Sequence, residues 1–182
     1  MTNLFKDIPP GENPPEKINV LIDIPKGGSN KYEYNKEKGY FELDRVLYSP
    51  FFFPFDYGFI PQTASEDNDS LDVILLTTFP TFPGCLIKTR PIGLFLMKDE
   101  KGLDNKIVAV PLEKIDPRFK EIQDINDLPE HLKKEIEVFF ADYKKLEKEK
   151  YKFVKIEGFQ GKEEAYEVIR KAIEKYKENL LK

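Results

Sequence analysis

Short strand-like runs, punctuated by proline and glycine, dominate the chain between residues 17 and 110 and most constrain its fold. The chain contains 14 prolines and 10 glycines, and several runs alternate between apolar and polar residues, as half-buried strands do. The expected strands cover residues 17–24, 31–34, 41–48, 57–60, 72–77, 87–97 and 106–110. Short strands at this spacing favour a closed or partly closed β-barrel with antiparallel character.

Helical periodicity appears only after residue 129. Apolar or aromatic side chains recur there at steps of three and four along two segments, which are Leu132, Ile136, Phe139, Phe140, Tyr143 and Leu146, and then Ala165, Val168, Ile169, Ala172, Ile173, Tyr176 and Leu180. These patterns predict helices over about 129–146 and from 163 onward. Strands first and helices last predict an α+β fold whose helices pack against the barrel.

The length of 182 residues suits a single domain over residues 1–182. Residues 1–16 are rich in proline, glycine and charge and are expected to form an irregular arm.

The chain shows neither a signal-peptide pattern nor a run of membrane-spanning length, so we expect a soluble, cytoplasmic protein. A formal charge of -4 gives no general attraction for nucleic acid or an anionic membrane, so neither is an expected partner.

The side chains available for chemistry are limited. Cys85 is the only cysteine and His131 the only histidine, which excludes an internal disulfide and a zinc site of the usual Cys/His kind within one chain. A Ser-His-Asp triad would rest on His131 alone. Chemistry in this chain is therefore expected to use carboxylates, lysines, arginines, tyrosines and metal ions.

Three carboxylates lie within six residues, at Asp67, Asp69 and Asp72, directly before an apolar run. Carboxylate oxygens are hard ligands that suit Mg²⁺, Mn²⁺ or Ca²⁺. In an extended segment Asp72 would point away from the other two, so a shared ion requires a turn near Asn68 and Ser70. A solvated acidic turn is the alternative interpretation.

A second acidic group, Asp99, Glu100 and Asp104, lies in an expected hairpin and has a similar alternative, a polar hairpin tip. Several cationic and phenolic residues at or near expected strand ends, or on an expected helix, complete the pattern, together with the carboxylate of Glu33. These residues are Lys31, Arg45, Tyr57, Lys106, Tyr143 and Lys144. Several carboxylates paired with several lysines and arginines suit the transfer of a multiply charged phosphate, because the carboxylates bind metal ions and the cations bind phosphate oxygens.

Taken together, these residues resemble the soluble family I inorganic pyrophosphatases of the prokaryotic type. The segment 67–72 resembles the Asp-x-Asp-Pro-x-Asp signature of that family, and the segments 31–33, 43–45, 56–58, 90–93, 106–111, 139–144 and 154–158 follow in the family's order. The resemblance runs from about residue 17 to the carboxyl terminus. It implies a five-stranded closed β-barrel of the oligonucleotide-binding (OB) type with flanking C-terminal helices.

The resemblance also implies an activity, the Mg²⁺-dependent hydrolysis of inorganic pyrophosphate to two orthophosphates by metal-activated water. Several Mg²⁺ ions would take part, with Mn²⁺ or other divalent ions as possible substitutes. The protein would form a homo-oligomer, a hexamer by resemblance.

Residue roles follow from the same resemblance. Asp69 would be the general base. The metal ligands would be Asp67, Asp72, Asp99, Asp104 and Glu33, with Asp23 and Glu100 as more distant contacts through water. Lys31, Arg45, Tyr57, Lys106, Tyr143 and Lys144 would bind the phosphate oxygens.

Four positions depart from the common family pattern. Asp23 replaces a longer Glu, and Phe53 replaces a Tyr and so lacks a hydroxyl. Ser70 replaces the usual Pro and Asn68 the frequent Gly or Asp, so the aspartate segment is expected to be less rigid. A lost hydroxyl hydrogen bond typically costs about 0.5–1.5 kcal/mol. None of these changes removes a proposed metal-binding aspartate or the proposed base, so activity is expected.

Two other functions fit parts of the pattern. One is a catalytically weak or silent phosphate-binding homologue. The other is an OB-type module for single-stranded nucleic acid, in which residues 51–55 would stack on bases. The acidic balance argues against the second, and the aromatic run is better suited to core or subunit-interface packing.

Overall fold

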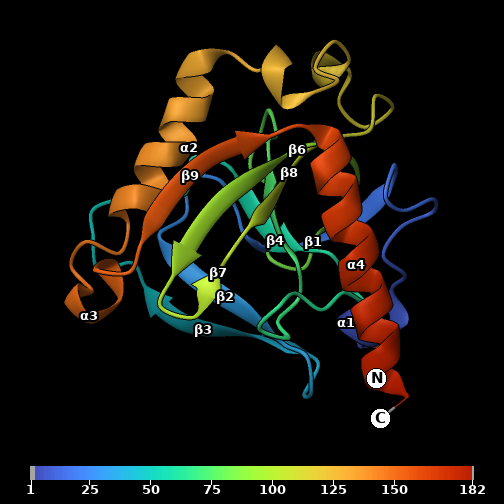
Figure 1. Ribbon diagram of the computed structural model, residues 1–182, viewed down its shortest axis with the longest axis horizontal. Coiled ribbons are helices and arrows are strands. Elements are labelled where there is room, and N and C mark those ends of the chain that lie inside the picture. Colours follow the sequence, from blue (N-terminus) through green and yellow to red (C-terminus); the bar gives the residue numbers. More distant parts are fainter. Residues whose placement is uncertain (1–2, 182) are drawn as a thin grey trace.

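A computed structural model describes residues 3–181 (Figure 1). The elements are α1 (Leu4–Asp7), β1 (Ile18–Ile24), β2 (Asn30–Asn35), β3 (Tyr40–Val46), β4 (Asp56–Phe59), β5 (Asp72–Leu75), β6 (Leu86–Asp99), β7 (Gly102–Leu103), β8 (Lys106–Pro111), the 3₁₀ helices η1 (Pro117–Phe119) and η2 (Ile125–Asp127), α2 (Glu130–Asp142), α3 (Lys148–Tyr151), β9 (Lys155–Gln160) and α4 (Lys162–Leu180). All of the predicted strands are present, with ends within two residues of those expected. The α+β class is confirmed.

Five strands form a closed ring of pairings in the order β1-β4-β5-β8-β6, which returns to β1. Ile18 of β1 lies opposite Thr89 of β6, and Leu21 of β1 lies opposite Phe59 of β4. The pairing of β5 with β8 is parallel, unlike the others in the ring. A parallel pair needs a long crossover connection, and here β6 lies within that connection. The antiparallel character predicted for the strands therefore holds for four of the five pairings.

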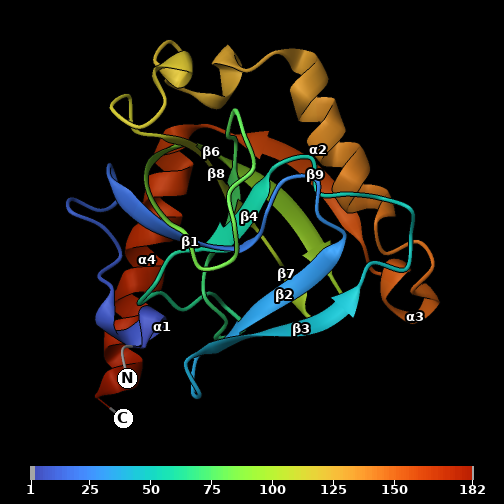
Figure 2. The same ribbon diagram turned by 180° about the vertical axis from the view of Figure 1, so that it is seen from behind.

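Three further strand pairings lie outside the ring, and the shortest joins β7 to the end of β6. β2 and β3 form a separate two-stranded sheet that projects beside the ring (Figure 2), and β9 pairs with β6. The sequence analysis did not predict β9. Its side chains are exposed or half-buried, so it has no apolar face to reveal a strand.

The ring is covered by two helices that bury different apolar faces (Figure 1). On α2, Ile136, Phe139 and Phe140 pack with Phe55 and Phe95 of the core. The α4 residues in the second apolar cluster are Ala165, Ile169 and Ala172. The second predicted helix is confirmed, whereas α2 ends at Asp142 rather than near residue 146, and turns follow it.

The aromatic run at residues 51–55 is largely core. Phe53 and Phe55 are buried, Phe51 packs partly against the same cluster, and Phe52 is exposed. Because the buried rings contact one another and Phe139, they are not available to stack on bases. The core-packing interpretation of this run is therefore the correct one for Phe53 and Phe55.

The segment expected to be an irregular arm contains the short helix α1. The Asn3 side chain caps it by accepting hydrogen bonds from the N–H groups of Phe5 and Lys6, both at 3.0 Å. Phe5 is buried against Phe59 and Tyr176, which attaches the arm to the rest of the chain. Within residues 3–181, every helix is too short or too polar to cross a membrane.

Candidate active site

One cavity of about 350 Å³ collects the residues that the sequence analysis selected. All fourteen line it: Asp23, Lys31, Glu33, Arg45, Tyr57, Asp67, Asp69, Asp72, Asp99, Glu100, Asp104, Lys106, Tyr143 and Lys144. They come from the ring, from the segment before β5, from the β2–β3 sheet, from the hairpin after β6 and from the end of α2. The structure thus places every selected residue around a single space.

The inner end of the cavity is built on three adjacent strands of the ring. Lys106 of β8 places its Nζ 3.0 Å from Oδ2 of Asp72 and 2.6 Å from Oδ1 of Asp104. The hydroxyl of Tyr57 on β4 donates to the same Asp72 oxygen at 2.5 Å. Only 2% of the Lys106 side chain is exposed. A buried ammonium ion therefore bridges two carboxylates at this end.

Burial and charge shift the protonation of this inner group. Burial alone lowers the pKa of Lys106, but the carboxylates of Asp72 and Asp104 outweigh it and raise that pKa above its ordinary value. Burial raises the pKa of Asp104, with Lys106 opposing and Asp72 reinforcing the change. Burial and the Asp72 carboxylate also raise the pKa of Tyr57, so its hydroxyl keeps its proton. The ammonium ion consequently stays charged and paired.

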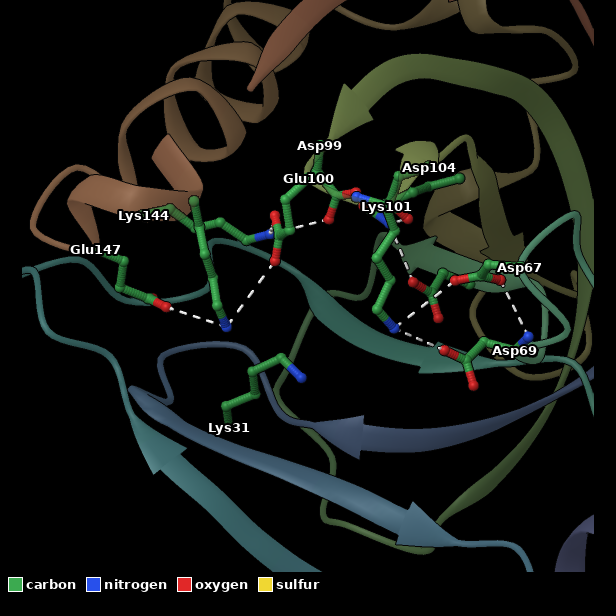
Figure 3. A network of polar contacts seen from close by, with 12 residues as sticks. Lys31, Asp67, Asp69, Asp99, Glu100, Lys101, Asp104, Lys144 and Glu147 are labelled. Atoms are coloured by element: carbon green, nitrogen blue, oxygen red, sulfur yellow. Dashed lines mark hydrogen bonds and ion pairs between the residues drawn. The ribbon is translucent and has the colours of Figure 1, made fainter. Parts of the chain in front are cut away.

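A second bridged pair lies beside the end of α2. Nζ of Lys144 is 3.0 Å from Oδ2 of Asp99 and 3.0 Å from Oε2 of Glu100 (Figure 3). Burial raises the pKa of Asp99, but the N–H of Lys101 and the Lys144 ammonium outweigh it and hold the pKa below its ordinary value. This pair links the hairpin after β6 to α2, which is distant in sequence.

The outer end is a turn at residues 65–69, which we call the aspartate turn. The Ser65 N–H donates to the Asp69 carbonyl oxygen at 2.7 Å, and the Asp69 N–H donates to Oδ1 of Asp67 at 3.0 Å. The Ser65 hydroxyl donates to the same Asp67 oxygen at 2.5 Å. Asn68 adopts φ 68°, a left-handed conformation that asparagine tolerates better than most residues. The turn predicted near Asn68 is present, whereas Ser70 lies buried just beyond it.

Two lysines that the sequence analysis did not select contact the aspartate turn. Lys101 Nζ lies 3.1 Å from Oδ2 of Asp69 and 3.8 Å from Oδ2 of Asp67, across the cavity in Figure 3. Lys36 Nζ lies 3.3 Å from the other Asp69 oxygen. Lys36 lies between the expected strands 31–34 and 41–48, and Lys101 lies within the expected hairpin of the second acidic group. A lysine in such a place is normally solvated surface, so neither was chosen as a site residue.

A further missed residue, Glu147, holds Arg45. Its Oε1 accepts hydrogen bonds from Nε and Nη2 of Arg45 at 3.3 and 3.2 Å, and the other terminal nitrogen of Arg45 lies 2.5 Å from Asp44. Lys31 pairs with Glu33 and lies 3.9 Å from Asp44. Only 6% of the Glu147 side chain is exposed. In sequence it lies within a run of lysines and glutamates, which looks like a solvated surface.

The carboxylates are paired with cations rather than grouped for metal binding. Within residues 3–181, no three Asp, Glu, His or Cys side chains are grouped so as to hold a metal ion. Lys101, Lys106 and Lys144 each lie between two carboxylates. One buried carboxyl oxygen of the cavity residues nevertheless has no hydrogen-bond partner, Oδ1 of Asp23. Burial, and then the Asp72 carboxylate, raise the pKa of Asp23 well above its ordinary value.

The donor chemistry of this cavity fits hard divalent cations. The available ligands are oxygens, which Mg²⁺ and Mn²⁺ prefer. An unpartnered buried carboxyl oxygen is costly until a cation or a donor reaches it. Metal ions of this class would satisfy the carboxylates if the lysines moved away.

Comparisons with known proteins converge on one family. The profile of the inorganic pyrophosphatase family matches residues 20–177. An inorganic pyrophosphatase of Sulfolobus acidocaldarius is 51% identical over 166 residues, which cover 91% of this chain and 95% of that protein. One from Aquifex pyrophilus is 46% identical over 173 residues, covering 95% and 97%. The crystal structure of the inorganic pyrophosphatase from Thermus thermophilus matches with a TM-score of 0.91 and 45% identity, covering 97% of this chain and 99% of that one.

Proposed function

This chain belongs to the inorganic pyrophosphatase family and hydrolyses inorganic pyrophosphate, and we propose that the residues around its cavity carry out the reaction. The observation that supports this assignment most strongly is the set of lysine-bridged carboxylate pairs in a single cavity. Such a set holds the two kinds of group that transfer of a multiply charged phosphate requires.

The proposal includes several divalent metal ions, Mg²⁺ in the first place, with Mn²⁺ as a possible substitute. Bound divalent ions neutralise phosphate oxygens and lower the pKa of water. The residues that would hold them are Asp67, Asp72, Asp99, Asp104 and Glu33. Asp23 and Glu100 would support the ions from farther away, Asp23 through the carboxyl oxygen that has no partner.

The cations of the cavity would exchange partners during the reaction. Lys106 and Lys144 each bridge two carboxylates in this structure. If these carboxylates held metal ions, the ammonium groups would be available to donate charge-assisted hydrogen bonds to phosphate oxygens. The remaining groups proposed to bind phosphate are Lys31, Arg45, Tyr57 and Tyr143.

Asp69 is the proposed general base that accepts a proton from the attacking water. Its side chain is 61% exposed at the cavity mouth, where half-buried Lys36 and exposed Lys101 contact it. A carboxylate in that position can reach a water inside the cavity while remaining in exchange with solvent. Proton transfer to a positioned side chain typically contributes about 10²–10⁴-fold to a rate.

The finer expectations from the sequence are part of the same proposal. We propose that the five-stranded ring is a barrel of the OB type. We also propose that residues 1–182 form one domain, that the protein is cytoplasmic, and that it assembles as a homohexamer. The test of the last point is the molar mass in solution by light scattering, and a monomeric mass at working concentration would contradict it.

The central experiment compares wild type, Asp69→Asn and Glu66→Gln in phosphate release from pyrophosphate with Mg²⁺. Asp69→Asn keeps the shape of the side chain but removes the base, so kcat should fall by about 100-fold or more. Glu66 is exposed in the same turn and lies outside the cavity lining, so Glu66→Gln should behave like wild type. If wild type released phosphate no faster than Asp69→Asn, the proposed role of Asp69 would be wrong.

A further inference from the structure

Helix α4 contacts the aspartate turn from outside the cavity. Nζ of Lys175 donates hydrogen bonds to the main-chain oxygens of Ser65 at 2.7 Å and Glu66 at 3.0 Å. Lys175 is half-buried and does not line the cavity. Its ammonium group therefore binds the main chain directly before Asp67, on the side away from the reacting groups.

A second contact attaches the same segment to the same helix. The Ala64 N–H donates to the carbonyl oxygen of Ala172 at 2.9 Å, and Ala172 is buried. Positions three apart on a helix lie on one face, so α4 presents Ala172 and Lys175 together to residues 64–66. The chain entering the turn is thus held at consecutive residues by one rigid helix.

Hydrogen bonds within the turn connect these anchors to the aspartates. The Ser65 oxygen that accepts from Lys175 also accepts from the Asn68 N–H at 3.1 Å, and the Ser65 hydroxyl donates to Asp67. A shift of the Ser65 peptide group would therefore move both Asp67 and Asp69.

We propose that Lys175 is a positioning residue for pyrophosphate hydrolysis, because it fixes the main chain from which Asp67 and Asp69 enter the cavity. This inference rests on the roles proposed above for those two aspartates. A single ammonium ion that binds two successive carbonyl oxygens restrains both peptide planes. Catalytic groups lose much of their effect when they are displaced by as little as about 1 Å.

Lys175→Met is the informative variant, because methionine keeps an unbranched apolar stem and loses the three donors. We expect kcat to fall about tenfold. KM for pyrophosphate should stay within about twofold of wild type, because the proposed phosphate-binding Lys106 and Lys144 are carried by β8 and the end of α2 rather than by the turn.

Two variants act as controls. Lys175→Arg supplies donors that can reach both carbonyl oxygens and should recover kcat to within about threefold of wild type. Lys177→Met removes the same charge from an exposed position on the same helix and should leave kcat unchanged. The inference is overturned if Lys175→Met has the kcat of wild type, or if Lys175→Arg is as impaired as Lys175→Met.

A binding measurement separates positioning from simple loss of folded protein. Electron paramagnetic resonance measures Mn²⁺ binding to metal-free protein. In Lys175→Met this binding should weaken a few-fold, because Asp67 is displaced. Urea unfolding of the same variant should show that the protein is folded. Unchanged Mn²⁺ binding, or a kcat loss explained by the unfolded fraction, overturns the inference. A wild-type rate in Asp69→Asn would instead disprove the proposed base, and the Mn²⁺ measurement would still test Lys175.

Discussion

At both ends of the cavity a lysine lies between two carboxylates, but the inner lysine is buried and the outer lysine is exposed. At the inner end, Lys106 of β8 lies between Asp72 of β5 and Asp104, which lies just before β8, and 2% of the Lys106 side chain is exposed. At the outer end, Lys101 lies between Asp67 and Asp69, on turns and 61% exposed. Removing one partner from a buried ion pair is strongly destabilising, whereas an exposed pair contributes little. Burial, rather than the number of charges, therefore decides how much each lysine matters for stability.

Because of this difference, the two ends of the cavity should respond differently to ligands. The inner group is fixed by strand pairing, so its oxygens are held in place before any ligand arrives. The outer group rests on two hairpin tips and a turn, and its lysines exchange readily with solvent. We expect metal ions and substrate to rearrange the outer end more than the inner end, and the predictions below test this contrast.

The largest effect should come from Lys106→Met. The change leaves Asp72 and Asp104 close together without their cation, so the free energy of unfolding of metal-free protein should fall by about 3–5 kcal/mol. Lys101→Met is the matched variant at the outer end and should cost less than about 1 kcal/mol. Urea unfolding in the presence of a chelator measures both, and equal losses would refute the contrast between the two ends.

Asp23→Asn should have the next largest effect and the opposite sign. Asp23 is buried next to Asp72, and its pKa is well above the ordinary value of 3.8. As pH rises above about 4, the unfolded chain loses this proton first while the folded protein retains it, so the free energy of unfolding falls with pH. Asparagine removes that fall and should stabilise metal-free protein at neutral pH by about 1–3 kcal/mol.

Urea unfolding as a function of pH tests the Asp23 prediction. Subtracting the wild-type profile from the Asp23→Asn profile isolates the contribution of this carboxyl group. A difference that does not grow as pH rises above 4 would show that Asp23 finds a partner in solution.

Tyr57→Phe should have a moderate effect at the inner end. The variant removes the hydroxyl that donates to Asp72, but Lys106 still pairs with the same oxygen. The free energy of unfolding should therefore fall by only about 1 kcal/mol. An unchanged midpoint in urea would mean that Lys106 alone satisfies Asp72.

The smallest effect on stability is expected at Lys101, where metal binding is the more sensitive readout. Lys101 pairs with Asp69 and with Asp67. Because Asp67 is a proposed metal ligand, Lys101→Gln should tighten Mg²⁺ binding about two- to fivefold, the size of one exposed ion pair. Isothermal titration calorimetry of metal-free protein measures this. Lys38→Gln, on an exposed lysine outside the cavity lining, is the control, and weaker binding in Lys101→Gln would contradict this prediction.

Much of the fold could be predicted because its signals are local. Short runs bounded by proline and glycine identified the strands of the ring, alternation at a period of two identified β2 and β3, and steps of three and four identified α2 and α4. The parallel pairing of β5 with β8 could not be predicted, since each strand alone looks the same whichever neighbour it pairs with. Polar β9 lacked an apolar face, and α1 is a single turn capped by Asn3, too short for a periodic pattern.

The residues that line the cavity could be selected from the sequence because they occur in the same order along the chain as the motifs of a known family. Residues outside that pattern were missed for a common reason. Lys36, Lys101 and Glu147 lie in charged segments that resemble solvated surface, and their partners are distant in sequence. Lys175 binds main-chain oxygens. Every residue type carries a main-chain oxygen, so such a contact cannot be predicted from the residue types of the partner segment.

The closure of the ring has a consequence for the synthesis of this protein. Ile18 of β1 pairs with Thr89, which is 71 residues further along the chain, so β1 leaves the ribosome long before its second neighbour. Until then that edge of β1 remains open to other strands. A nascent chain that has not yet reached residue 144 carries the carboxylates of both acidic segments without Lys144 or Lys175, so the cation that pairs with Asp99 and Glu100 and the one that anchors the aspartate turn arrive last during translation.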